Sequence, residues 1–323
     1  MSPRSREGIS SDERQGQVDE EVDSREVSAA ALRTSLVIVN KDERLLSDTL
    51  DAVEPFVGRA LFEVVVVDAS EGRLDDIRLA HEWVKWIDYK QPPGVRITIA
   101  HQRNLGVRLA EGDVIVFTDS GCLPENGWLE RLLAPILEEG EFVSCGPARS
   151  IGKSVYSGVH WWGNANEDYV PMATTINLAF RREAFDAVGG FDEAFGSAED
   201  IDFTWRLTDH GYRLRWVQDA VVRHDWGTPQ RQLRRAFFYG KGGCRLLRKH
   251  PERIRETAKQ NSVPMVYALF LLGLPVTLKW RWYPLALLWP IWRHRKEELR
   301  WLVLLDHLTM GAGMLHEFLR PGT

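Results

Sequence analysis

The sequence is poor in cysteine, and it has no uninterrupted apolar run long enough to cross a membrane. Its three cysteines, Cys122, Cys145 and Cys244, form neither a framework of pairs nor a metal-binding spacing, which predicts reduced thiols and a cytoplasmic protein. A spanning helix needs about 20 apolar residues, whereas the apolar stretches near the C-terminus are shorter and contain proline. These absences exclude a disulfide-stabilised secreted scaffold and argue against a spanning hairpin.

The first 30 residues have almost no large apolar side chains and are acidic and polar. Such a segment buries too little surface to offset its ordering entropy, so we predict a disordered acidic tail over residues 1–32. The tail also lacks the apolar core of a secretory signal. In this interpretation residues 33–243 form one α/β domain, and residues 244–323 form a basic and apolar helical region.

Short apolar runs without alternation follow the tail, and helical patterns separate them. The runs are "TSLVIVN" (34–40), "FEVVVVDAS" (62–70), "VRITIAH" (95–101) and "VIVFTDSG" (114–121). This pattern predicts strands buried on both faces of a mainly parallel, doubly wound α/β sheet. Ligands bind at the carboxyl ends of the strands in such a sheet, and Asn40, Asp68 and Asp119 stand at these ends.

The pattern after Gly140 is mixed. "FVSCGPARS" and "TTINLAFRREAF" predict strands, the second leading into a helix near Arg182, and "AEDIDFTWRLTDHG" predicts a helix. "YRLRWVQDAVVRHDW" alternates as a half-exposed strand does. The second half of the domain is therefore expected to depart from simple strand–helix–strand units.

The last 95 residues reverse the charge balance, with 17 Lys and Arg against 6 Asp and Glu from Pro229 onward. They also hold "VPMVYALFLLGLPVTL" and "WYPLALLWPIW", with Lys279, Trp280, Arg281 and Trp282 between them. Trp beside Lys and Arg favours the headgroup region of a bilayer. A packed helical subdomain, a surface-lying or re-entrant membrane contact and a spanning hairpin all stay open; we favour contact with the inner face of the plasma membrane.

Taken in order, these segments resemble the family 2 glycosyltransferases, inverting enzymes of the GT-A fold that use nucleotide-sugar donors. The resemblance covers residues 35–243 and rests on "LVIVNKDERL", "VVVVDASEG", "HQRNLGVRLAEGDVIVFTDSGC", "NLAFRREAFDAVGGFDEAF", "AEDIDFTWRL" and "DAVVRHDW". It implies transfer of a sugar from a UDP- or dTDP-sugar to a hydroxyl acceptor, either lipid-linked or in a cell-envelope glycan. The alternative is a non-catalytic nucleotide-sugar-binding protein on the same fold; a nucleic-acid partner is not expected.

The resemblance also assigns the donor site. Asn40 lies in the first nucleotide-binding loop, and Asp68 is expected to accept a hydrogen bond from the nucleotide base, which suits an acceptor-only carboxylate. Arg103 is expected to hold a phosphate through its fork of donors, with a surface salt bridge as the alternative. Arg234 and Arg235 are expected either to cover the diphosphate or to belong to a solvated helix face.

The Asp-x-Asp motif of the family, which holds a divalent cation, reads Asp119-Ser120-Gly121 here and lacks its second carboxylate. Mg²⁺ tolerates one or two carboxylates when phosphates and waters complete its shell, and His224 matches a family position that contributes a further ligand. We therefore expect Mg²⁺ or Mn²⁺ at Asp119 and His224. Two alternatives are a transferase that dispenses with the cation and a protein that binds nucleotide without turnover.

The segment "EDID", residues 199–202, matches the family's catalytic-base motif. The resemblance implies that Asp200 accepts the proton of the acceptor hydroxyl and that Glu199 orients the acceptor. Both acids stand at the start of a predicted helix, where helix capping is the alternative role. The helix N-terminus is expected to lower the pKa of Asp200 and keep it ionised.

Overall fold

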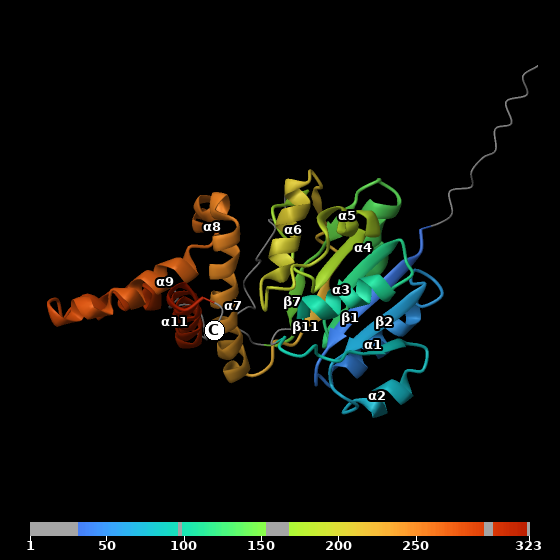
Figure 1. Cartoon of the computed structure of the whole chain (residues 1–323), viewed down its shortest axis with the longest axis horizontal. Helices are drawn as coiled ribbons and strands as arrows, with labels where there is room; N and C mark the ends of the chain where they lie inside the picture. The colour runs from blue at the N-terminus through green and yellow to red at the C-terminus, as the bar shows by residue number, and fades with distance from the viewer. Residues whose placement is uncertain (1–31, 96–98, 153–167, 294–299, 322–323) are drawn as a thin grey trace, which may run out of the picture. The chain divides into compact units, whose positions relative to one another are not determined.

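A computed structural model describes residues 32–95, 99–152, 168–293 and 300–321 (Figure 1). The predicted acidic tail, apart from residue 32, lies outside the described residues, as do the tandem tryptophans Trp161 and Trp162.

The centre of the fold is an eight-stranded mixed sheet. Its strands run in the order β3 (Lys85–Asp88), β2 (Glu63–Asp68), β1 (Thr34–Asn40), β4 (Val114–Thr118), β9 (Asn177–Arg181), β6 (Val143–Cys145), β10 (Leu214–Trp216) and β8 (Tyr169–Val170). The first four are mutually parallel, as are β6 and β10, whereas β9 is antiparallel to both neighbours and β8 is antiparallel to β10. The prediction of a mainly parallel α/β sheet is confirmed.

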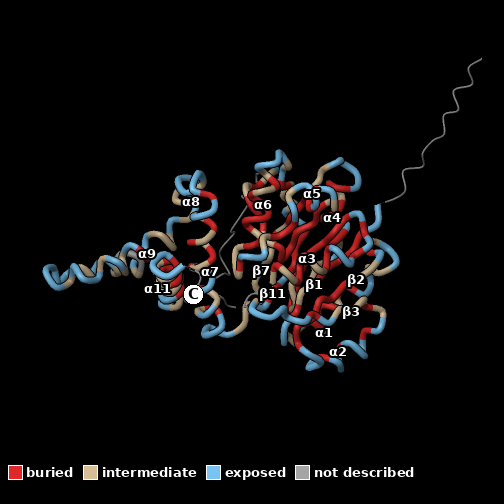
Figure 2. Tube along the Cα trace, in the orientation of Figure 1, coloured by how far each residue is buried: buried red, intermediate tan, exposed pale blue. Residues whose placement is uncertain are grey.

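Helices cover both faces of this sheet, and alternate strand residues pack into the two clusters on its opposite sides. The strands are coloured as buried along most of their length in Figure 2. Leu36 and Ile38 pack with α1 (Leu46–Val53) and α4 (Trp128–Leu137). Val37 packs with α3 (Ile99–Leu109), α5 (Arg182–Val188) and α6 (Glu199–Asp209). All three strand side chains are fully buried, which accounts for the lack of alternation in the sequence.

A second, three-stranded sheet adjoins the end of β4. It has the order β5 (Cys122–Pro124), β11 (Val222–His224) and β7 (Ala148–Ser150). The register pairs His224 with Cys122 and with Ser150. This small sheet therefore places the end of β11 directly beside the loop that contains Asp119.

The C-terminal third is helical. Its elements are α7 (Pro229–Lys249), α8 (Ile254–Gln260), α9 (Val263–Leu272), α10 (Leu288–Arg293) and α11 (Arg300–Leu319), with short 3-10 turns at Pro251–Arg253, Leu274–Leu278 and Tyr283–Leu287. Helix α11 packs on α7 and α9. No described helix is both long enough and apolar enough to span a bilayer. Helix α7 runs unbroken through residue 243, where the sequence placed a domain boundary.

One local prediction was wrong, and one strand was not predicted. The run "VRITIAH" was expected to form a strand, but helix α3 begins at Ile99 and includes His101, and residues 96–98 of the run lie outside the described residues. The neighbouring strand is instead β3, whose side chains are only partly buried and which pairs with β2 alone at the edge of the sheet. A polar edge strand does not show the apolar run by which the other strands were recognised.

Candidate active site

Polar side chains at the ends of β1, β2 and β4 join in one hydrogen-bond chain. The Asn40 amide donates from Nδ2 to Asp68 Oδ1 (3.1 Å) and accepts at Oδ1 from the Ser120 hydroxyl (2.7 Å). Ser70 also donates to Asp68 Oδ1 (2.6 Å). Asp68 is 3% exposed, and among the described residues both side-chain hydrogen bonds that it accepts end on Oδ1, not on Oδ2. The Asp68 carboxylate is thus held in place through Oδ1, and Oδ2 can accept a hydrogen bond from a ligand.

The loop after β4 has a backbone that suits glycine at position 121. Gly121 has a φ of +86°, a left-handed conformation that side chains other than those of Asn and Asp seldom adopt. Its N–H donates to Thr49 Oγ1 (2.9 Å), and a Cβ here would lie 3.4 Å from Leu45 and 3.9 Å from His224 Cε1. The position that would carry a second carboxylate therefore lies against Leu45 and His224.

Arg103 connects the loop of Asp119 to the start of α6. Its Nη1 forms an ion pair with Glu199, and its Nη2 lies 3.8 Å from Asp119 Oδ1. Arg103 and Glu199 are both buried, so the surface salt bridge considered from the sequence is not what forms. The Nε of Arg103 has no hydrogen-bond partner among the described residues. The Glu199 carboxylate is already paired with Arg103, and this argues against a direct hydrogen bond between Glu199 and the acceptor.

Asp200 stands beside this ion pair, in the first turn of α6. The preceding Ala198 has a φ of +65°, and the Asp200 carboxylate accepts from the N–H of Ile201 at 2.9 Å. Burial, and then the negative charge of Glu199, raise the pKa of Asp200 to about 7. The expectation that the helix N-terminus lowers this pKa was wrong: desolvation and a neighbouring carboxylate outweigh the dipole and the charge of Arg103.

His224 is the second residue assigned to a cation. Burial lowers the pKa of its imidazole, although Asp119 acts on it in the opposite direction. Its Nδ1 lies 3.5 Å from Cys122 Sγ, and the Trp226 ring packs edge-on against it with centroids 4.7 Å apart. A neutral imidazole is the form that binds metal ions, and the loop that contains Asp119 lies against this ring, since a Cβ at Gly121 would be 3.9 Å from His224 Cε1.

The donor set near Asp119 is small. Among the residues that the structure describes, no group of three or more His, Cys, Asp and Glu side chains is arranged to hold a metal ion. One carboxylate and one neutral imidazole suit a cation that shares its shell with substrate phosphates and water, not one held in a protein cage. Asp119 and His224 therefore fit a cation only if substrate phosphates and water complete its coordination shell.

Helix α7 adds a cation and a phenol to the same region. Arg235 donates from Nη1 to the carbonyl of Trp226 (3.0 Å), and its charge acts on both His224 and Tyr239. Tyr239 is 40% exposed as a whole residue, yet desolvation of its phenol and the charges of Asp200, Asp119 and Glu199 raise its pKa, against the effect of Arg235. Of the arginine pair expected near the diphosphate, Arg235 therefore lies near the acids.

Arg234 is exposed on the neighbouring face of α7, and no contact joins it to the acids among the described residues. The segment "GKGG", residues 240–243, lies inside the same helix, so it is not a phosphate-binding loop.

The structure thus brings together residues from five separate segments of the chain. Asp68 and Asn40 connect through Ser120 to the loop of Asp119, Arg103 connects that loop to Glu199, and Asp200 follows. Sequence reasoning missed Ser120, Tyr239 and the Arg103–Glu199 pair. A signal existed only for Tyr239, which lies one helical turn after Arg235 and so on the same face of α7.

The comparisons with known proteins agree with this architecture. A model described as glycosyl transferase family 2 matches residues 35–191, and one described as glycosyl transferase family group 2 matches residues 150–315. The pre-mycofactocin glycosyltransferase of Mycobacterium tuberculosis is 30% identical over 237 residues, covering 67% of this chain and 48% of that protein. The chain therefore spans about half the length of this relative.

Two solved structures share the fold. The mannosyltransferase PcManGT from Pyrobaculum calidifontis, in complex with GDP-Man and Mn²⁺, has a TM-score of 0.64 and 17% identity, and the match covers 91% of this chain and 89% of that one. GalNAc-T7 with UDP, GalNAc and Mn²⁺ has a TM-score of 0.51 and 17% identity, covering 72% and 58%. With a family model that matches more than half of its residues and the GT-A architecture around its acids, the chain belongs to the family 2 glycosyltransferases.

Proposed function

We propose that this protein is an inverting glycosyltransferase that moves a sugar from a nucleoside-diphosphate sugar to a hydroxyl acceptor. The observation that carries the proposal is the convergence of Asp68, Asp119, Arg103 and Asp200 at the carboxyl ends of the strands. Ligands of doubly wound sheets bind at this edge. The relatives and structural neighbours that share the fold are named as transferases.

Asp68 and Arg103 hold the base and the diphosphate of the donor, respectively, in this proposal. Asp68 Oδ2 accepts the N3–H of uracil or thymine, which makes a UDP- or dTDP-sugar the proposed donor. Arg103 offers its Nε, and Arg235 its guanidinium, to the diphosphate. Asn40 and Ser120 keep the Asp68 carboxylate in position.

Asp200 is the proposed catalytic base. As the acceptor oxygen bonds to the anomeric carbon, the bond from that carbon to the diphosphate breaks on the opposite face, and the acceptor proton passes to the Asp200 carboxylate. A pKa of about 7 makes this carboxylate a stronger base than an ordinary aspartate while leaving much of it ionised at neutral pH. Glu199 acts through Asp200 and Arg103 in this account, as a positioning residue.

Asp119 and His224 would hold a divalent cation, Mg²⁺ or Mn²⁺, together with the phosphates of the donor. When bound, such a cation neutralises the charge that develops on the leaving nucleoside diphosphate. Both structural neighbours, GalNAc-T7 and PcManGT, were solved with Mn²⁺, which supports the choice of metal to test.

The proposed acceptor hydroxyl is attached to a lipid or to a cell-envelope glycan and is met at the cytoplasmic face of the plasma membrane. The basic and apolar C-terminal region supports this part of the proposal, since Lys, Arg and Trp are the side chains that favour the headgroup region.

The second candidate function is a nucleotide-sugar-binding protein without turnover, which Gly121 favours because it removes a carboxylate from the motif. A release assay for free nucleoside diphosphate separates the two. The full chain is incubated with UDP-, dTDP- and GDP-sugars and a membrane-lipid extract as the source of hydroxyl acceptors, with Mn²⁺ or with EDTA, while calorimetry measures binding of each nucleoside diphosphate. We expect release from one donor class that EDTA abolishes. Binding without release would instead establish the non-catalytic protein, and release that persists in EDTA would remove the cation from the account.

A further inference from the structure

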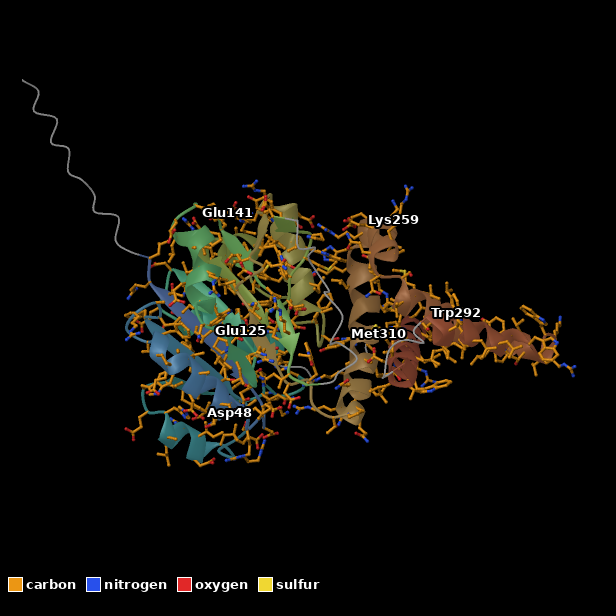
Figure 3. The ribbon with its side chains drawn as sticks, turned by 180° about the vertical axis from the view of Figure 1, so that it is seen from behind. Asp48, Glu125, Glu141, Lys259, Trp292 and Met310 are labelled. Carbon is orange, nitrogen blue, oxygen red and sulfur yellow. The ribbon has the colours of Figure 1, made fainter. Side chains whose placement is uncertain are left out.

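Residues 263–293 form a hairpin-like segment, called here the apolar arm, that consists of α9, two 3-10 turns and α10. Its inner end is packed: Tyr267 and Ala268 are buried, and Gly311 of α11 lies so close that a Cβ there would be 2.6 Å from the Tyr267 carbonyl carbon. The rest of the arm, orange in Figure 1, extends away from α11, which is red, and it carries Trp292 (Figure 3).

The arm is internally ordered. The rings of Phe270 and Tyr283 stack with centroids 5.1 Å apart, and the Tyr283 hydroxyl donates to the Phe270 carbonyl at 3.1 Å. Trp280 packs edge-on against Tyr283, and the Arg281 guanidinium lies over the Trp282 ring at 4.9 Å. The turn between the two halves is thus built by its own aromatic side chains.

Beyond this inner end, many large apolar residues of the arm are exposed, and the arm is drawn mostly in pale blue and tan in Figure 2. Leu278 is 89% exposed, Trp280 57% and Trp282 53%. The others are Val266, Leu269, Leu272, Leu274, Val276, Leu285, Leu288 and Trp292. Scattered apolar residues on a surface are ordinary, but a continuous run of them marks an interaction site.

Charge on the arm has one sign. The sequence has no Asp or Glu from residue 257 to residue 296, whereas Lys279 and Arg281 alternate with Trp280 and Trp282 at the turn. A bilayer with anionic headgroups matches this surface, because Trp favours the interface and each Lys or Arg near an anionic surface adds attraction. A two-fold contact between turns of two copies would instead place like charges together.

We infer that residues 278–282 of the apolar arm insert into the headgroup region of an anionic bilayer and hold the protein at its surface. Leu278 and the indole rings supply the apolar contact, and Lys279 and Arg281 select anionic lipid. This inference identifies a binding surface outside the donor site and does not rest on the proposed transfer reaction. No spanning segment is required, in agreement with the absence of a membrane-spanning helix among the described residues.

Co-sedimentation of the full chain with vesicles tests this surface. One set of vesicles is phosphatidylcholine alone, and the other contains phosphatidylglycerol as well. The variants are Leu278→Glu, the double variant Lys279→Gln/Arg281→Gln, and the matched control Leu79→Glu, which changes a leucine that is 71% exposed on α2 (Asp75–Ala80). Circular dichroism shows whether each variant folds, and gel filtration reports the oligomeric state.

We expect the chain to prefer anionic vesicles and Leu278→Glu to weaken vesicle binding by about tenfold or more, since burying one leucine contributes roughly that factor. The double variant should bind anionic vesicles roughly thirtyfold more weakly, at about 1 kcal/mol for each cation, and lose the preference between the two vesicle types. Leu79→Glu should bind as the parent does.

Three results would overturn the inference. They are a parent chain that binds neither vesicle type, a folded Leu278→Glu variant that binds as the parent does, and a Leu79→Glu variant that is weakened equally. A concentration-dependent dimer that Leu278→Glu dissociates, with no vesicle binding, would assign the arm to a second copy instead. Brominated lipids give an independent measurement: they should quench the fluorescence of the parent more than that of Trp280→Phe/Trp282→Phe.

Discussion

At the scale of single residues, the protonation of Asp200 is the feature on which the chemistry depends. Its pKa is raised to about 7, by burial first and by Glu199 second, while Arg103 lowers it. A general base must be ionised to accept a proton. The ionised fraction therefore falls as pH drops through 7, to roughly a tenth at one pH unit below the pKa.

We predict that nucleoside diphosphate release declines below pH 7 and that Glu199→Gln moves this decline to lower pH. The reason for the sign is that the variant removes a neighbouring negative charge, so the ionised form of Asp200 becomes easier to reach. The measurement is the pH profile of kcat/KM for both proteins. If kcat/KM of Glu199→Gln declines at the same pH as that of the parent, or at a higher pH, Asp200 is not the base whose ionisation sets the profile.

Ser120 carries a second prediction at this scale. Its hydroxyl donates to Asn40, which in turn donates to Asp68. Ser120→Ala should weaken nucleoside diphosphate binding by about fivefold, because a hydrogen bond of this kind contributes about 1 kcal/mol.

Calorimetry measures nucleoside diphosphate binding by the parent, by Ser120→Ala and by the control variant Ser262→Ala. The control changes a serine whose side chain makes no capping hydrogen bond to helix α9. Equal affinities for the parent and both variants would show that the hydrogen-bond chain does not position Asp68.

At the scale of elements, α7 and α11 approach closely because glycines face the partner helix. A Cβ at Gly240 would lie 1.9 Å from the Met310 carbonyl oxygen, and one at Gly313 would lie 2.0 Å from the Phe237 carbonyl oxygen. Met310 is marked on α11 in Figure 3. The contact fixes α7, which carries Arg235 and Tyr239 at the site, against the helix that supports the apolar arm.

Gly240→Ala should therefore destabilise the protein by about 2 kcal/mol, since overpacking forces backbone shifts of that cost. Gly243→Ala is the matched control: it lies in the same helix with no atom within 4 Å of its Cβ position, and it should stabilise by about 0.5–1 kcal/mol through helix propensity. Urea unfolding of the three proteins measures both changes. The same sign for both substitutions would contradict the packing described for α7.

The strands also show where sequence reasoning fails at this scale. Residues of β1, β2 and β4 are buried on both faces, and their unbroken apolar runs identified them. The edge strand β3 was missed because its side chains are half exposed. The β-branched run before Arg103 suggested a strand, yet helix α3 begins within it and buries Gln102, Arg103 and Asn104, so tertiary contacts overrode local propensity.

At the scale of the whole molecule, the positions of the site residues were largely predictable, and their interactions were not. The rule that ligands bind at the carboxyl ends of parallel strands located Asn40, Asp68 and Asp119. Nothing local in the sequence pairs Arg103 with Glu199, which is 96 residues away. The pKa of Asp200 likewise follows from burial and from a charge that folding brings beside it.

The central claim is that Asp200 removes the acceptor proton while Asp68, Asp119 and Arg103 hold the donor. The most direct measurement is nucleoside diphosphate release by Asp200→Asn, compared with the parent and with Asp209→Asn, which alters an aspartate at the other end of α6. The account predicts that kcat falls about 100-fold or more for Asp200→Asn, with nucleotide binding retained, and that Asp209→Asn turns over as the parent does. Turnover by Asp200→Asn within a few-fold of the parent would contradict it.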